Sequence, residues 1–146
     1  MMLYILDADG TLTAQRGGSA GPFEQTLLPG VAQKCAAPRE QGHVLSLASN
    51  QGGARWDKDG RRTIGAVHAQ LRWTARAIGA VAYKFAVNKA NGRYKPSPAM
   101  LIELMRELGF DADETIFIGD QETDRQAAEA ACVRFIWADK FFGGIE

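Results

Sequence analysis

The stretch I-L-D-A-D-G-T-L-T, residues 5–13, places two carboxylates, Asp7 and Asp9, directly behind an apolar run. Residues 3–6 are apolar enough to predict a short buried strand. A carboxylate that is buried alone is costly unless it is paired or bound to a metal ion. The strand therefore either ends in solvent or delivers two acids to a ligand, with Gly10 allowing a sharp turn of the backbone next to it.

The composition predicts one globular domain over residues 1–146. Of the 146 residues, 46% are apolar and 23% are charged, which is enough for a buried core. No apolar run approaches the roughly 20 residues of a membrane span. The acidic pair follows the start of the chain without a basic segment, so we expect no signal peptide. Cys35 and Cys132 lack metal-ligand spacing and are expected to be small buried residues in a reducing compartment, so we expect a cytoplasmic protein. We also expect a monomer.

The charge is balanced overall but unevenly distributed. The segment from Arg55 to Lys95 holds ten of the 17 bases and only two of the 17 acids. Such a surplus suggests an anionic partner, although a solvated basic face would have the same composition.

Apolar patterns predict alternating strands and helices along the whole chain. Short apolar runs predict the strands, and apolar residues spaced by three and four predict the helices. The expected strands are 3–6, 43–48, 81–87, 115–118 and 133–137, and the expected helices are 30–41, 63–78, 97–108 and 124–131. Pro38 is expected to break or kink the last turn of the first helix. This order implies a three-layer α/β/α fold around a parallel, Rossmann-like sheet of about five strands.

Side chains capable of chemistry follow four of the expected strands. They are Asp7, Asp9, Ser49, Asn50, Lys95, Asp120 and Asp124. In open α/β sheets, ligands bind outside the carboxyl ends of the strands. We therefore expect these side chains to meet at one edge of one sheet.

The residue types at that edge suit phosphoryl transfer. Carboxylates such as Asp7, Asp120 and Asp124 are ligands that Mg²⁺ accepts. A carboxylate can also act as a nucleophile and form an aspartyl-phosphate. A second acid two residues along could protonate the leaving oxygen and later deprotonate water. The Ser49 hydroxyl and the Lys95 ammonium could bind the phosphoryl oxygens.

The motifs Asp7-Ala-Asp9-Gly-Thr11, Ser49-Asn50, Lys95-Pro and Gly-Asp120-x-x-x-Asp124 resemble the four ordered motifs of haloacid dehalogenase-type phosphatases. The S-N-Q and K-P-S-P-A-M runs are most similar to the subgroup that holds histidinol-phosphate and heptose-bisphosphate phosphatases and the phosphatase half of polynucleotide kinase–phosphatases. The resemblance implies a Mg²⁺-dependent phosphatase with an aspartyl-phosphate intermediate.

The resemblance also implies a role for each matching residue. Asp7 would be the nucleophile and Asp9 the general acid and base. The substrate phosphate would be bound by Gly10, Thr11, Ser49, Asn50, Arg55 and Lys95. The metal ion would be held by Asp7, the Asp9 carbonyl, Asp120 and Asp124. The stretch before Lys95, F-A-V-N-K-A-N-G-R-Y-K, has no cysteine or histidine, so no zinc is expected.

The leaving group stays open at this point. Segments 13–28 and 51–62 are too short, or too poor in pattern, for an inserted cap domain, so we expect no cap or a minimal one. An open site fits either a sugar or polyol phosphate or the 3′-phosphate end of a nucleic acid, which the basic segment would favour. A non-catalytic phosphoryl-binding domain is the third reading, but its signature would be the loss of Asp7 or Asp9, and both are present.

Overall fold

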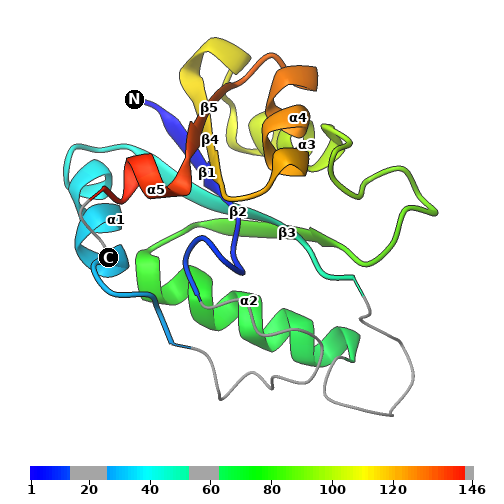
Figure 1. Cartoon of the computed structure of the whole chain (residues 1–146). Helices are drawn as coiled ribbons and strands as arrows, with labels where there is room; N and C mark the ends of the chain where they lie inside the picture. The colour runs from blue at the N-terminus through cyan, green and yellow to red at the C-terminus, as the bar shows by residue number, and fades with distance from the viewer. Residues whose placement is uncertain (14–25, 53–62, 144–146) are drawn as a thin grey trace.

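In a computed structural model of the protein, residues 1–13, 26–52 and 63–143 are described. The predicted alternation of strands and helices is confirmed there (Figure 1). The elements in chain order are β1 (Leu3–Leu6), α1 (Val31–Glu40), β2 (Val44–Asn50), α2 (Ile64–Ile78), β3 (Ala82–Ala86), α3 (Ala99–Leu108), the 3₁₀ helix η3 (Ala112–Glu114), β4 (Thr115–Gly119), α4 (Glu122–Ala130), β5 (Arg134–Trp137) and α5 (Ala138–Phe141).

The five strands form one parallel sheet in the order β3-β2-β1-β4-β5. The first strand lies at its centre, where Leu6 pairs with Leu47 of β2 and with Ile118 of β4. The strand order reverses direction at β1, and ligands bind at such switch points in open α/β sheets. The residues that follow β1 therefore occupy the position where a site is expected.

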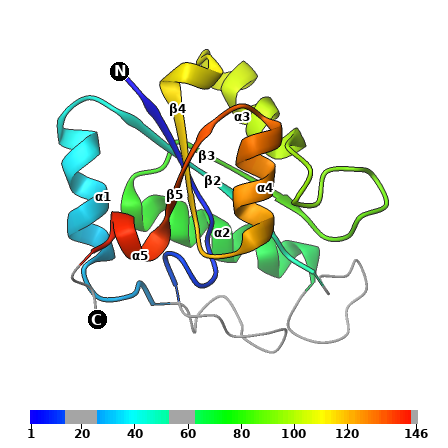
Figure 2. The ribbon, with the colours of Figure 1, turned by 45° about the horizontal axis from the view of Figure 1, so that its top comes forward.

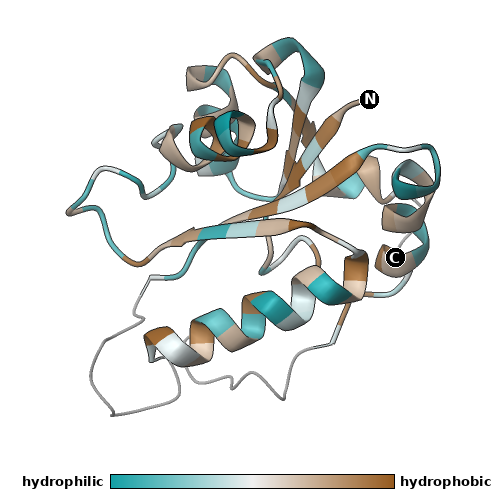
Figure 3. Ribbon diagram, turned by 180° about the vertical axis from the view of Figure 1, so that it is seen from behind, coloured by the Kyte–Doolittle hydropathy of each residue, from teal (hydrophilic) through white to brown (hydrophobic). Residues whose placement is uncertain are grey.

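Helices cover both faces of the sheet, as the predicted three-layer fold requires (Figure 2). Helices α1, α2 and α5 pack on one face and α3 and α4 on the other, each with its own buried apolar cluster. Along β1 the side chains alternate between these clusters: Leu3 and Ile5 face α3 and α4, whereas Leu6 faces the other three helices. Strand residues contribute to the apolar clusters on both faces of the sheet, and Figure 3 shows hydrophobic segments alternating with more polar ones along the strands.

Local signals set the ends of the helices. The Thr63 side chain accepts a hydrogen bond from the Ala66 N–H at 3.1 Å and caps α2, which ends at Gly79 in a left-handed conformation. Gly109 ends α3 in the same way. Helix α1 continues through Pro38 to Glu40, so the expected break at this proline does not occur.

Several sequence-based expectations need correction. Strand β2 continues to Asn50, so Ser49 and Asn50 belong to the strand itself, and α4 begins at Glu122 rather than at Asp124. The short helices η3 and α5 were not expected. Cys35 is buried as expected, but Cys132 is exposed, because it occupies a left-handed turn (φ 61°) between α4 and β5.

Within the described residues, no helix is long and apolar enough to cross a membrane. The expectation of no cap or a minimal cap rests on segments 13–28 and 51–62, most of which lie outside the described residues.

Candidate active site

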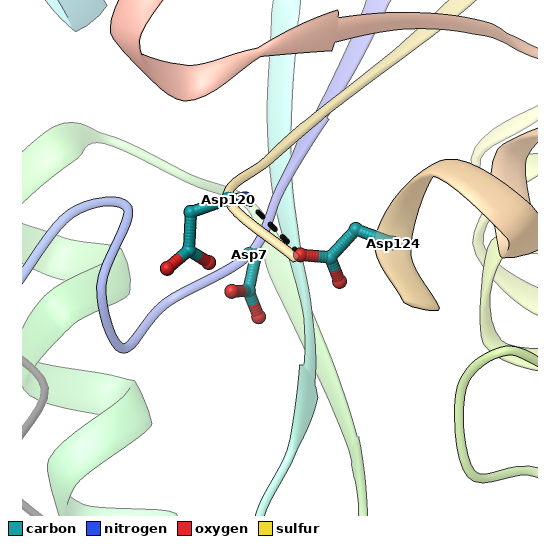
Figure 4. Close-up of side chains that lie close together, drawn as sticks. All are labelled: Asp7, Asp120 and Asp124. Carbon is teal, nitrogen blue, oxygen red and sulfur yellow. Dashed lines mark hydrogen bonds between the residues drawn. The ribbon is translucent and has the colours of Figure 1, made fainter. Parts of the chain in front are cut away.

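Three aspartates meet at the carboxyl ends of the two central strands. Asp7 follows β1, whereas Asp120 and Asp124 come from the end of β4 and the first turn of α4, and Figure 4 shows the three side chains close together. A carboxylate oxygen from each lies within 4.8 Å of one from the others. The prediction that these distant parts of the sequence meet at one sheet edge is confirmed.

Lys95 is buried between two of these acids. Its Nζ donates to Asp7 Oδ1 at 2.8 Å, to Asp124 Oδ1 at 2.6 Å and to the Ala48 carbonyl at 3.0 Å. All three donor positions of the ammonium are thus engaged. The lysine neutralises one of the carboxylates of the cluster and fixes the orientation of Asp7 and Asp124.

Burial controls the protonation of this cluster. It raises the pKa of Asp7 to about 6; the charge of Lys95 opposes the shift and Asp120 adds to it. Burial and the charge of Asp7 likewise raise the pKa of Asp124, against the effect of Lys95. For Lys95, burial alone would lower the pKa, but the neighbouring charges of Asp7 and Asp124 outweigh it and the pKa lies above its usual value.

Asp124 has its carboxylate oxygens engaged by the protein. Oδ1 accepts from Lys95, and Oδ2 accepts from the backbone N–H groups of Asp120 and Gln121 at 3.2 and 3.1 Å. Space next to it is tight, since a Cβ on Gly119 would lie 2.5 Å from Asp124 Oδ2. This geometry makes Asp124 a support for the turn after β4 and for Lys95.

Asp7 and Asp120 provide the carboxylates that fit a divalent cation. The Thr11 hydroxyl donates to Asp120 Oδ1 at 3.3 Å and orients it. Carboxylate oxygens in this number suit Mg²⁺, a hard ion that takes oxygen ligands and keeps several waters. A cation would also offset the repulsion between the closely spaced acids.

Asp9 is held apart from this cluster by three side chains. Its Oδ1 accepts from the Thr13 hydroxyl at 3.3 Å and from Gln70 Nε2 at 3.4 Å, and its Oδ2 accepts from Gln51 Nε2 at 3.3 Å. Gly10, in a left-handed conformation (φ 83°), turns the chain so that its N–H meets the Thr13 carbonyl at 2.7 Å. This turn brings Thr13 back to Asp9.

Ser49 and Asn50 have different surroundings. The buried Ser49 hydroxyl accepts from Gln51 Nε2 at 2.8 Å and lies at the end of β2. The Asn50 amide clamps the backbone of Lys95: its Oδ1 accepts from the Lys95 N–H at 2.8 Å, and its Nδ2 donates to the Lys95 carbonyl at 3.0 Å. Asn50 therefore fixes the loop that carries the lysine. Phosphate binding stays a prediction for the four residues Gly10, Thr11, Ser49 and Asn50.

Gln70 was not among the predicted site residues. It belongs to the buried face of α2, and the signal that could have identified it is one amide among Val67, Leu71 and Ala75. Arg55, in contrast, was predicted to bind phosphate and lies outside the described residues.

A cavity of about 570 Å³ opens next to the acidic cluster. Its lining includes Gly10, Thr11 and Asp120, together with Trp137 at the end of β5 and residues of α5 such as Lys140. The cavity leaves room for a ligand beside Asp120.

The known proteins to which this chain is similar include members of the group that the motifs resemble. The family model of haloacid dehalogenase-like hydrolases matches residues 82–138. A D-glycero-beta-D-manno-heptose-1,7-bisphosphate 7-phosphatase of Mesorhizobium japonicum is 26% identical over 91% of this chain and 67% of its own length. The D-glycero-D-manno-heptose-1,7-bisphosphate 7-phosphatase of Thermosynechococcus vestitus is 29% identical over 95% of this chain and 79% of its own.

Solved structures share the fold. A D,D-heptose 1,7-bisphosphate phosphatase from B. bronchiseptica, crystallised with magnesium and phosphate, superimposes with a TM-score of 0.76 at 24% identity, covering 100% of this chain and 89% of its own. The predicted resemblance to haloacid dehalogenase-type phosphatases, and the fold that it implies, are confirmed.

Proposed function

We propose that this chain, as a haloacid dehalogenase-type phosphatase, hydrolyses a phosphomonoester through an aspartyl-phosphate on Asp7. The observation that carries the proposal is the surroundings of Asp7, a buried carboxylate oriented by Lys95 and close to Asp120. Asp9 lies two residues further, outside the acidic cluster and in its own set of hydrogen bonds. We therefore assign the attack to Asp7 and the proton transfer to Asp9.

In the first step, a carboxylate oxygen of Asp7 attacks the phosphorus of the ester. The bond from phosphorus to the leaving oxygen breaks, and Asp9 gives its proton to that oxygen, so an alcohol leaves. Lys95 holds Asp7 in the attacking orientation through the 2.8 Å bond. The buried ammonium also stabilises the negative charge that develops on the phosphoryl group.

In the second step, water attacks the phosphorus of the aspartyl-phosphate. Asp9, now ionised, accepts a proton from this water, the bond between phosphorus and Asp7 breaks, and phosphate is released. Both residues return to their starting states. The Ser49 hydroxyl, at the end of β2, would hold a phosphoryl oxygen through both steps.

Mg²⁺ is the cofactor that these residues fit. Asp7, Asp120 and the Asp9 carbonyl would hold it, with Asp124 supporting the turn that presents Asp120. The ion would supply positive charge to the phosphoryl oxygens and so lower the barrier to attack by the anionic Asp7. An experiment without magnesium therefore tests the same proposal.

The substrate that best fits is a sugar or polyol phosphate. Its support is the similarity to heptose-bisphosphate phosphatases over most of the chain. The 3′-phosphate end of a nucleic acid is the second candidate, favoured by the basic segment between Arg55 and Lys95.

The test begins with hydrolysis of an aryl phosphate with and without Mg²⁺. Asp7→Asn should lower the turnover at least about a thousandfold, because the nucleophile is lost. Asp113→Asn, on the exposed 3₁₀ helix, is the matched control and should retain full turnover. Unchanged hydrolysis by the Asp7 variant would refute the assignment.

A substrate panel then separates the two leaving groups. Release of phosphate from a sugar bisphosphate and from a 3′-phosphorylated oligonucleotide is compared at two salt concentrations. Preference for the sugar, with little effect of salt, is expected. Preference for the oligonucleotide that weakens with salt would favour the nucleic-acid reading.

A further inference from the structure

We infer that Gln70 of α2 is a positioning residue for proton transfer by Asp9, an inference that rests on the proposed function. Gln70 Nε2 lies 3.4 Å from Asp9 Oδ1, although 61 residues separate the two in sequence. The glutamine is 4% exposed and comes from a helix on one face of the sheet. The packing of α2 on the sheet, rather than closeness in sequence, brings its amide to Asp9.

The position of Gln70 in α2 is unusual for a polar side chain. The buried face of this helix is otherwise formed by apolar residues and by Thr74, whose hydroxyl donates to the backbone carbonyl of Gln70 at 3.0 Å. Burying an amide without a partner is costly, so buried polar side chains are normally hydrogen-bonded. The Nε2 of Gln70 meets this requirement by donating to Asp9.

The three donors act differently on the two oxygens of Asp9. Within the described residues, Oδ1 accepts from Thr13 and Gln70, whereas Oδ2 accepts only from Gln51. A carboxylate oxygen has two lone-pair positions, so Oδ1 is fully engaged and Oδ2 keeps one position open. Oδ2 is consequently the oxygen that exchanges the proton.

Gln70 and Thr13 together prevent the carboxylate from rotating and exchanging its oxygens. Gln51 adds a second constraint, since its Nε2 also donates to the Ser49 hydroxyl at 2.8 Å and so links the proton-transfer oxygen to the predicted phosphate site. Without Gln70, Asp9 would sample orientations in which Oδ2 points away from the leaving oxygen. Proton transfer depends on such alignment.

The leaving group provides a readout that a merely structural role would not change. An alkyl phosphate has a basic leaving oxygen and needs protonation, whereas p-nitrophenyl phosphate has a stable leaving anion and needs little. Because kcat/KM covers the steps through departure of the leaving group, Gln70→Met should lower it about tenfold for a hexose phosphate. For p-nitrophenyl phosphate, the same variant should change kcat/KM less than about twofold.

Thr74→Val is the matched control. It removes a buried hydrogen bond on the same face of α2 but leaves the donors to Asp9 in place. We expect it to change kcat/KM for both esters by the same factor. Gln70→Leu, which also lacks a donor to Asp9 and suits the apolar face of α2, should repeat the selective loss even where the methionine variant folds poorly.

The outcomes separate the inference from the proposed function. An equal loss for both esters in the Gln70 variants, or no loss, overturns the positioning role while hydrolysis by the unaltered protein still supports the phosphatase. If the unaltered protein hydrolyses neither ester with Mg²⁺ present, both proposals are overturned.

Discussion

Replacing Lys95 with methionine tests the buried charge cluster directly. The variant removes one ammonium that donates to Asp7 at 2.8 Å and to Asp124 at 2.6 Å, and methionine fills a similar volume. The two carboxylates stay behind at 6% and 1% exposure. Removing one partner of a buried ion pair costs about 3–5 kcal/mol, because the remaining charge is uncompensated, and we expect a loss in this range.

The loss should depend on pH. With Lys95 present, the pKa of Asp7 is about 6 in the folded protein and 3.8 in the unfolded chain. Lys95 lowers the folded value, so its removal raises this pKa further. Between the two values the folded state holds a proton that the unfolded state has released, so the variant gains stability as the pH falls. The loss caused by Lys95→Met should be largest at pH 8 and smaller at pH 5.

Urea unfolding at both pH values, followed by circular dichroism with EDTA present, measures these losses. Lys84→Met is the matched control, because Lys84 forms partly exposed ion pairs with Glu103 and Glu107 on the surface. Pairs of this kind contribute about 0–1 kcal/mol. A loss for Lys95→Met that equals the control, or one that is the same at pH 5 and pH 8, would refute the description of a buried charge cluster.

Two further predictions concern the same cluster. Gly119→Ala should destabilise the protein by about 2 kcal/mol and reduce phosphatase turnover, since its Cβ would lie 2.5 Å from Asp124 Oδ2. The control, Gly65→Ala in exposed, open space on α2, should be neutral or stabilising. Similar effects of the two variants in urea unfolding would contradict the prediction. In EDTA, the protein should gain stability relative to Asp7→Asn as the pH falls from 7 to 4, because the Asp7 pKa is raised on folding; parallel pH profiles of the two would exclude the raised pKa.

The sequence predicted most of the fold because the periodic patterns are local. Strands such as Leu3–Leu6 and helices such as α3 carry their apolar spacing and stop signals within a few residues. The errors arise where a turn decides the outcome. Cys132 has an apolar side chain, but the turn between α4 and β5 places it in a left-handed conformation at the surface.

The sequence could predict the position of those site residues that directly follow a strand. Parallel strands bring their carboxyl ends to one edge, so Asp7, Asp120 and Asp124 could be placed together from the order of the motifs alone. Which groups bond to which depends on packing in three dimensions. No sequence pattern shows that Asn50 clamps the backbone of Lys95, or that Gln70 reaches Asp9 from a helix.

The central position of β1 has a consequence for synthesis of the protein on the ribosome. Its neighbours are β2 and β4, and β4 begins only at Thr115, so one edge of the first strand stays unpaired until most of the chain has been translated. Lys95, which donates a hydrogen bond to Asp7, lies 88 residues further along the sequence. At about 5–20 residues per second, β1 waits on the order of ten seconds for its second neighbour. During that interval the edge of β1 that later pairs with β4 lacks its partner, and Asp120 and Asp124 cannot yet join Asp7.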